Sequence, residues 1–156
     1  MEPAESDIME RKPRPVKENV LNWLSGMIVI LQGFSMSMIA FGVFILSEKQ
    51  PWGAPSDLAR QTLTFTTLVA MHLFQSFLSK SVTNSIFQTG LFGNLWMILA
   101  FVISFGFLVL GIYGPGVAHW LEFEPFQAIG WAVVFIASGI HVVFVELMKL
   151  VIRVSQ

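Results

Sequence analysis

Residues 91–113 read LFGNLWMILAFVISFGFLVLGIY and carry no charged side chain. A bilayer core about 30 Å thick is crossed by roughly 20 apolar residues of α-helix, and this stretch has that length. Gly114-Pro115-Gly116 follows it, where proline lacks a backbone donor and glycine favours turns. The stretch therefore predicts a membrane-spanning helix that ends at residue 113.

The rest of the chain has the same apolar character. Of its 156 residues, 54% are hydrophobic and 12% are charged, about half the charged fraction of an ordinary soluble domain. The charges are bunched and leave four uncharged stretches, residues 19–47, 61–79, 81–121 and 125–145. This pattern indicates a multi-pass membrane protein, whose first partner is the lipid bilayer.

The uncharged stretches predict four membrane spans in a domain of residues 20–151. The stretch 81–121 is too long for one helix, and it divides at the polar segment SVTNSIFQTG. The expected spans are about 20–46, 61–79, 91–113 and 126–151, of which the second is the shortest and least apolar. The predicted fold is an all-α, polytopic four-transmembrane-helix bundle.

The basic residues predict the orientation of this bundle. Seven lie on the side that holds the termini and the loop after the second span: Arg11, Lys12, Arg14, Lys17, Lys80, Lys149 and Arg153. Only Lys49 and Arg60 lie on the opposite side. Because cytoplasmic loops carry the excess of Lys and Arg, both termini are predicted to be cytoplasmic, as an arm (1–19) and a tail (152–156).

Charge and cysteine content argue against several other classes. The formal net charge is −1, which gives no support for nucleic-acid binding. The chain contains no cysteine, so it forms no disulfide and no thiolate metal site. The first twenty residues mix acids with bases and lack an apolar run with a cleavage site, so they are not read as a secretory signal.

Four motifs stand in one order along the chain: EPAESDIMERKPRP (2–15), TFTTLV (64–69), SIFQTGLFGN (85–94) and ELMKLVIRV (146–154). In this order, and with four spans, the chain resembles spans seven to ten of the P-type cation-transporting ATPases. The resemblance is strongest to calcium-pump-like members and covers essentially the whole chain. It implies a C-terminal module of an ATP-driven transporter in the cell membrane or an internal membrane.

The resemblance also implies what this chain does not do alone. In the family, ATP chemistry needs a D-K-T-G-T phosphorylation loop, a T-G-E loop and a nucleotide domain, and none of them is present here. We therefore expect no catalytic residue, no cofactor and no enzyme activity in this chain alone. ATP and magnesium are implied only for the full-length pump, whose N-terminal part would be the partner.

The second span carries a polar stripe whose role has two readings. His72, Gln75, Ser76 and Ser79 fall at i, i+3, i+4 and i+7, which is one face of a helix. They either hydrogen-bond to neighbouring helices, at roughly 1 kcal/mol each, or line an ion path.

The family resemblance favours interhelical hydrogen bonding over an ion path. Alignment through SIFQTGLFGN puts a common asparagine of the family at Gln75 and the glutamate of its calcium pumps at Val82, so that carboxylate is lost. One amide with hydroxyls is a poor site for a hard cation, and interhelical bonding is the favoured reading.

Other polar residues are weaker candidates. His141 lies in mid-span and is either a functional ionisable group or a neutral histidine bonded to serine or backbone, which we favour. Lys149 is expected to pair with Glu146 at i, i+3, and Lys149 and Arg153 are read as membrane anchors.

Two further groups of polar residues are given structural readings. His119, Glu122 and Glu124 are too sparse to assign as a metal site. Gln32 and Ser35 in the first span are read as part of a helix-packing surface.

Two functions remain open from the sequence. The favoured one is a pump's C-terminal membrane module that scaffolds the ion-binding helices. The alternative is a self-standing four-span protein that regulates or assembles with another membrane transporter. Because Met1 falls inside what resembles the loop between the sixth and seventh spans, we expect either a pump fragment or a separately made tail.

Overall fold

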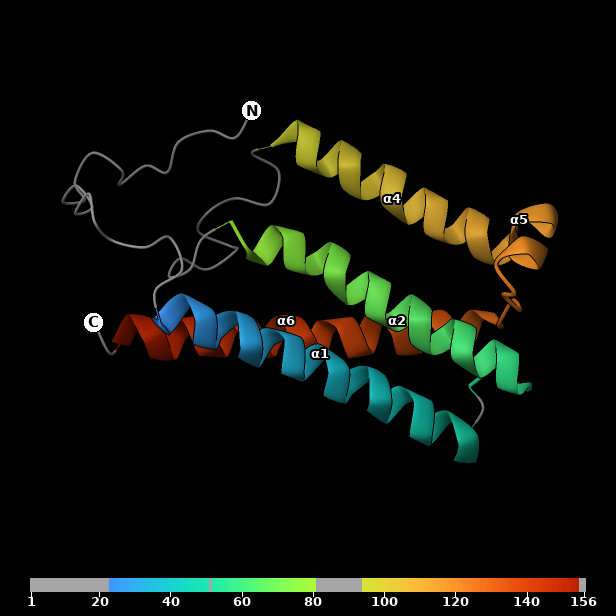
Figure 1. The fold of residues 1–156 in the computed structure, drawn as a ribbon, viewed down its shortest axis with the longest axis horizontal. Coiled ribbons are helices and arrows are strands. Elements are labelled where there is room, and N and C mark those ends of the chain that lie inside the picture. The colour runs from blue at the N-terminus through green and yellow to red at the C-terminus, as the bar shows by residue number, and fades with distance from the viewer. Residues whose placement is uncertain (1–22, 51, 81–93, 155–156) are drawn as a thin grey trace.

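The computed structural model describes residues 23–50, 52–80 and 94–154 (Figure 1). These ranges contain only helices and their connections, with no strand, which confirms the all-α prediction for the described part of the chain. The helices are α1 (Trp23–Lys49), α2 (Asp57–Leu78), α4 (Leu95–Tyr113), α5 (Pro115–Trp120) and α6 (Ala128–Val154).

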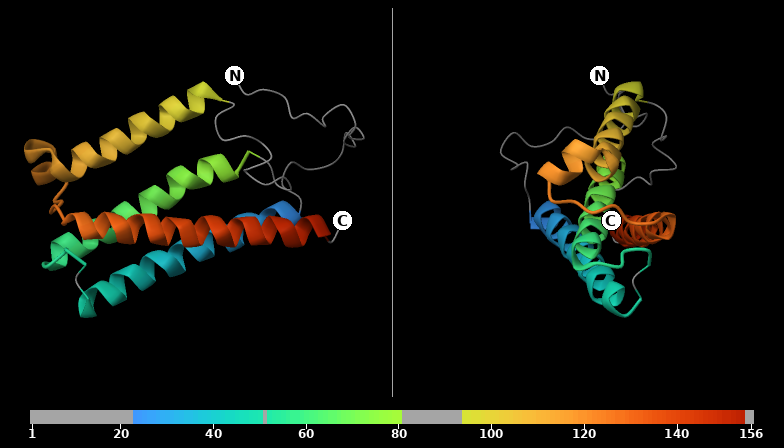
Figure 2. Two further views of the ribbon diagram at one scale, coloured as in Figure 1. Left: turned by 180° about the vertical axis from the view of Figure 1, so that it is seen from behind. Right: turned by 90° about the vertical axis from the view of Figure 1, so that its right-hand side faces the viewer.

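The helix α2 occupies the centre of the bundle. It contacts α6, α1 and α4, and Figure 2 shows these three helices arranged around it when the bundle is viewed from its end. The helix α4 has contacts with α2 and the short α5. A polar residue on α2 can therefore reach three neighbours, depending on the face it occupies.

Three helices are long and apolar enough to cross a membrane: α1 from Gly26 to Lys49, α4, and α6. The helix α2 has 22 residues but is not among them, because threonine, glutamine, serine and histidine lower its hydropathy. By length and composition, these three helices are candidate membrane spans. The fourth span and the side on which the termini lie stay predictions.

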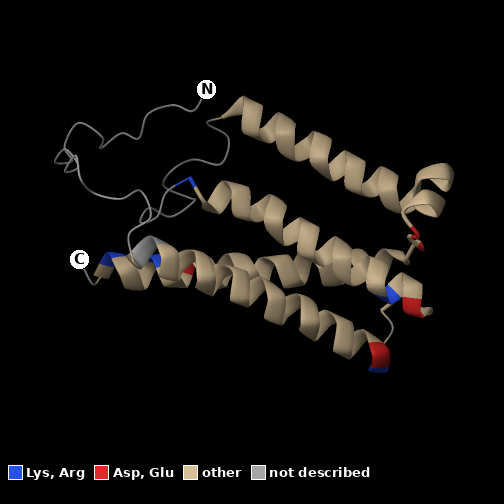
Figure 3. Cartoon of the chain, in the orientation of Figure 1, with Lys and Arg blue, Asp and Glu red and all other residues tan. Residues whose placement is uncertain are grey.

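Charged side chains gather at the two ends of the described bundle (Figure 3). One end holds Glu48, Lys49, Asp57, Arg60, Glu122 and Glu124, and the other holds Lys80, Glu146, Lys149 and Arg153. The helical segments between these ends are uncharged. This layering matches an apolar slab bounded by two polar surfaces.

Capping residues explain where two of the helices begin. Ser56 starts α2 because its side chain accepts a hydrogen bond from the Ala59 amide at 2.9 Å. Asn94 starts α4 in the same way, with Oδ1 accepting from the Trp96 and Met97 amides at 3.1 and 3.3 Å. Each cap satisfies amides that have no partner inside the helix.

The short helix α5 was not predicted from the sequence. Gly114-Pro115-Gly116 predicted the end of a helix at residue 113, and α4 does end at Tyr113. The chain then begins a new helix at Pro115 rather than continuing as a loop. Proline is well tolerated at a first helical position, where its missing amide hydrogen would have no partner, so it starts α5 while it ends α4.

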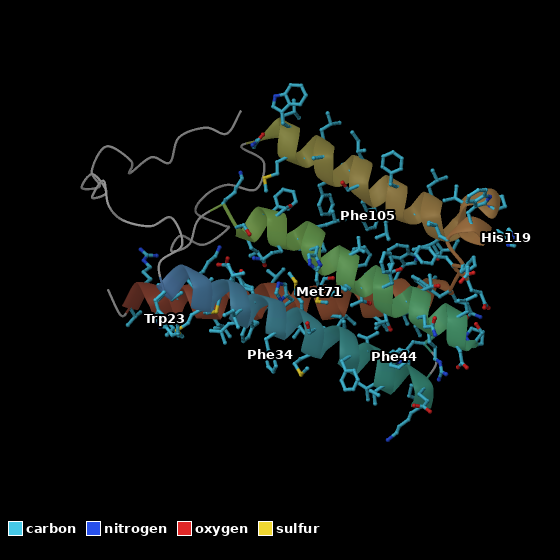
Figure 4. All side chains as sticks on the ribbon, viewed as in Figure 1. Trp23, Phe34, Phe44, Met71, Phe105 and His119 are labelled. Atoms are coloured by element: carbon cyan, nitrogen blue, oxygen red, sulfur yellow. The ribbon has the colours of Figure 1, made fainter. Side chains whose placement is uncertain are left out.

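The buried and exposed faces agree with a bilayer as solvent. The buried stripe of α6 consists of Gly130, Val134, Ala137, Ser138, His141, Val145 and Lys149. Met71 of α2 is fully buried, whereas Phe34 and Phe44 project from the outer edge of α1, where they are 61% and 41% exposed (Figure 4). Large exposed apolar side chains are expected where the surrounding medium is hydrocarbon.

Candidate functional site

A buried histidine joins three helices. His141 on α6 is fully buried, and its Nδ1 lies 2.9 Å from Ser35 Oγ on α1. Its Nε2 lies 3.0 Å from Gln75 Oε1 on α2. One imidazole ring therefore links α1, α2 and α6, and both of its nitrogens have a partner.

Gln75 extends this contact into a network. Its Nε2 donates to Gln32 Oε1 on α1 at 2.9 Å and to Ser79 Oγ one turn along α2 at 3.2 Å. The Ser79 hydroxyl in turn donates to the Gln75 carbonyl at 2.9 Å. We call Gln32, Ser35, Gln75, Ser79 and His141 the polar network, in which every hydrogen-bonding atom of the Gln75 amide is engaged.

The hydrogen-bond partners of the His141 ring determine which of its nitrogens carries the hydrogen. Gln75 Oε1 can only accept, so His141 Nε2 carries a hydrogen. In the neutral ring, Nδ1 then accepts from the Ser35 hydroxyl. That hydroxyl also lies 2.9 Å from the Gln32 carbonyl, its alternative acceptor. The network is satisfied by neutral groups, which suits a site inside a bundle of apolar helices.

The structure divides the residues that the sequence singled out. Gln75 and His141 meet in the polar network, and Ser79 joins it through Gln75, whereas His72 and Ser76 take no part in it. His72, Ser76 and Ser79 are all exposed on α2. His72 Nδ1 is 2.8 Å from the Leu68 carbonyl, and the Ser76 hydroxyl donates to the Leu73 carbonyl at 2.7 Å. The i, i+3, i+4, i+7 stripe is wide enough for one edge to face α1 and α6 while the other is open.

The sequence predicted only a packing role for Gln32 and Ser35. Gln32 and Ser35 were read as a packing surface, but they supply the α1 side of the network. A usable signal was present, because Gln32 is the only amide side chain among residues 23–47 and Ser35 follows it by one turn. Such a lone amide in an apolar helix indicates a polar partner on another helix.

Lys149 is not the lipid anchor that the sequence suggested. It is 4% exposed, and its Nζ donates to the Leu78 carbonyl, at the end of α2, at 2.7 Å. The predicted pair with Glu146 is present at 3.3 Å. Because the last carbonyls of a helix lack partners inside it, an ammonium group there fastens α6 to the end of α2.

The polar network contains no carboxylate. Across residues 23–50, 52–80 and 94–154, no group of three or more His, Asp and Glu side chains could hold a metal ion. Near the opposite end of the bundle, Glu124 instead accepts a hydrogen bond from Ser56 Oγ, and its amide donates to Thr62 Oγ1 at 3.1 Å. Val82, where the calcium-pump glutamate would align, lies outside the described residues.

Comparison with known proteins identifies the family. The family model described as "Cation transporting ATPase, C-terminus" matches residues 1–151. A calcium-transporting ATPase of Bacillus subtilis is 35% identical over 116 residues, which cover 74% of this chain and 13% of the relative.

Two further relatives match most of the chain. Calcium-transporting ATPase 1 of Bacillus cereus is 27% identical over 96% of the chain and 18% of its own length. Calcium-transporting ATPase type 2C member 2 of the rat is 28% identical over 96% of the chain and 16% of its own length. The chain thus spans less than a fifth of the length of these relatives.

The family match and the three apolar helices lead to one conclusion. The chain is an integral, multi-pass membrane protein that belongs to the C-terminal domain family of the cation-transporting ATPases.

Proposed function

We propose that the chain is the C-terminal membrane module of a calcium-transporting P-type ATPase and that it scaffolds the helices that bind the ion. The relatives carry the name calcium-transporting ATPase, and most of their length lies outside the matched part. In this proposal, phosphorylation and nucleotide binding occur in the remainder of the pump, which also supplies the need for ATP and magnesium. This chain alone hydrolyses no ATP and binds no cofactor.

The scaffolding role is best supported by Gln75, because both hydrogen-bonding atoms of its side-chain amide have partners. Its carbonyl oxygen accepts from His141, and its amide hydrogens reach Gln32 and Ser79. A ligand for a hard cation must offer a carbonyl or carboxylate oxygen to the ion. Since Gln75 Oε1 points to α6 and is already bonded, the polar network holds helices together rather than coordinating an ion.

The arrangement of α2 supports a fourth membrane span, and with four spans both termini lie on the same side of the membrane. The helix lies along α1 and α6, two of the three candidate spans (Figures 1 and 2). Its four described threonine side chains each donate to the carbonyl four residues earlier, for example Thr66 to Thr62 at 2.7 Å. Hydroxyls bonded in this way carry no free hydrogen, which makes a crossing by α2 acceptable in lipid.

The proposal is tested by recovering the protein from its native membrane. An antibody against LVIRVSQ (residues 150–156) would precipitate it from mildly solubilised membranes, and the precipitate would be incubated with radiolabelled ATP and calcium. We expect a calcium-dependent phosphorylated polypeptide in the precipitate, either continuous with this chain or bound to it.

Two results would contradict the proposal. Recovery of another transporter without any phosphorylated polypeptide would support the self-standing assembly partner instead. Phosphate on a polypeptide of 17.5 kDa, the mass of this chain, would contradict the assignment of catalysis to the remainder of the pump.

A further inference from the structure

An apolar pocket lies where α4 ends and α5 begins, at the edge of the bundle (Figures 1 and 2). It is open on one side, has a volume of about 460 Å³ and is lined by residues from Leu110 to Leu121, among them Gly116, Val117 and Trp120. Only apolar atoms face its interior. Small-molecule sites in proteins have volumes of about 300–1,000 Å³, so the pocket has room for a hydrocarbon group of a ligand.

A sharp turn after α5 forms one wall of the pocket. The Phe123 amide donates to the Ala118 carbonyl at 2.8 Å, and Glu122, which precedes Phe123, has a left-handed φ of +53°. This turn brings Leu121 back onto α4, where a Cβ added at Gly111 would lie 3.4 Å from Leu121 Cδ1. The pocket is therefore built by hydrogen bonds and close packing of the backbone, and it is a defined feature of the fold.

The pocket lies at the boundary between the apolar part of the bundle and one of its charged ends. Leu110 belongs to the last turn of the candidate span α4, whereas Glu122, directly after the pocket, is exposed in the charged end (Figure 3). In a bilayer, acyl chains meet the polar headgroups at this depth. Water is a poor occupant, because an apolar cavity offers it no hydrogen bonds. Hydrocarbon from the surrounding lipid is the occupant that this depth supplies.

Trp120 adds a hydrogen-bond donor to the rim of the pocket. Its side chain is 89% exposed, and its indole N–H has no hydrogen-bond partner among the described residues. Trp131 on α6, by contrast, donates to the Tyr113 hydroxyl at 2.9 Å. A helix of another polypeptide uses its backbone carbonyls in its own hydrogen bonds, whereas a phospholipid carries ester and phosphate oxygens next to its chains. An apolar pocket with a donor at its rim therefore fits a phospholipid better than a helix.

We propose that this pocket binds a phospholipid, with the upper part of an acyl chain in the pocket and an ester or phosphate oxygen accepting from Trp120 Nε1. The exposed carboxylate of Glu122 follows the pocket and repels an anionic headgroup, so the site selects a zwitterionic lipid such as phosphatidylcholine. The site needs only a bilayer and the fold of α4 and α5, so it goes beyond the proposed function and does not depend on it.

Photolabelling by a lipid tests the site in the full protein. The protein would be reconstituted in vesicles of phosphatidylcholine, a fraction of which carries a diazirine near the glycerol end of one chain, and labelled peptides would be identified by mass spectrometry. We expect stronger label on residues 110–121 than on residues 95–107 of α4, whose outer face meets bulk lipid.

Filling the pocket should displace the acyl chain. A Cβ at Gly116 would meet nothing within 4 Å, so the side chain of Gly116→Leu can occupy the pocket without a clash. We expect this variant to lower the label on residues 110–121 by about fourfold to fifteenfold, the effect of one or two methylene groups that are no longer buried. The matched control is Gly106→Leu, at an exposed and equally open position of α4, which should leave that label unchanged.

Two further comparisons test the polar contacts. Trp120→Phe keeps an aromatic ring but removes the N–H, and it should lower the label on residues 110–121 about threefold, the size of one hydrogen bond in a membrane. Phosphatidylglycerol with the same diazirine should label these residues less than phosphatidylcholine does, because its headgroup is anionic.

Several results would overturn the proposal. Label on residues 110–121 that is no stronger than on 95–107, or that survives Gly116→Leu, would show that no acyl chain occupies the pocket. Equal labelling with Trp120→Phe, or by phosphatidylglycerol, would refute the proposed headgroup contacts. If Gly116→Leu does not fold, brominated phosphatidylcholine tests the same contact. Bromine near the glycerol end should quench the fluorescence of the unaltered protein more than that of Trp120→Phe, and equal quenching would contradict the site.

Discussion

His141 Nε2 on α6 lies 3.0 Å from Gln75 Oε1 on α2, and the same ring reaches Ser35 on α1 through Nδ1 at 2.9 Å. This places the only fully buried histidine of the described residues at the junction of three helices. The stability of the bundle should therefore depend on His141.

Replacing His141 by leucine should destabilise the bundle. His141→Leu keeps the volume roughly constant but leaves Gln75 Oε1 without its donor, while the Ser35 hydroxyl keeps the Gln32 carbonyl as acceptor. A buried polar group without a partner costs about 1–3 kcal/mol, so the thermal midpoint of the detergent-solubilised protein should fall. The matched control is His119→Leu on the exposed surface of α5, which should leave the midpoint unchanged. Equal midpoints for the two variants would contradict the role of His141.

Lys149 should stabilise the bundle through its hydrogen bond to the last turn of α2. Lys149→Met removes the 2.7 Å bond to the Leu78 carbonyl and leaves Glu146 without the ammonium at 3.3 Å. Breaking a largely buried pair in this way should lower stability by about 2–4 kcal/mol. Arg153→Met, at an exposed position of the same helix, is the control. Should Lys149→Met prove as stable as this control, the lysine is an anchor, as the sequence suggested.

Gly53 sets the turn between α1 and α2. Its φ of +80° is a left-handed conformation, and a Cβ there would lie 2.7 Å from Gln127 Cβ and 2.8 Å from Ile129 Cγ2. Gly53→Ala should therefore destabilise the protein by about 1–3 kcal/mol, read as a fall in the thermal midpoint. A Cβ at Gly116 would meet nothing within 4 Å, so Gly116→Ala should be neutral. A neutral Gly53→Ala would show that the loop packs differently.

The sequence predicted the class of fold well because uncharged stretches of membrane length have few alternatives. It was less informative for α2, whose polar residues lower the hydropathy below that of a membrane span. It also missed α5, because glycine and proline end one helix and start the next with the same residues.

The site was partly accessible from the sequence. The spacing of His72, Gln75, Ser76 and Ser79 identified a polar face, and Gln75, Ser79 and His141 do meet. Spacing along one helix does not say which edge of that face meets a neighbour. That depends on how α1 and α6 pack on α2, which brings Gln32 and Ser35 to Gln75 and leaves His72 and Ser76 outside.

We propose that Gln75 holds helices together and does not bind the transported ion. Gln75→Leu in the complete pump separates these two roles when calcium affinity and thermal stability are measured on the same preparation. We predict an unchanged calcium affinity with a loss of stability of about 1–3 kcal/mol, because the leucine leaves His141 Nε2 and Gln32 Oε1 without their Gln75 partner. A tenfold loss of calcium affinity at unchanged stability would contradict the scaffold and identify Gln75 as a ligand.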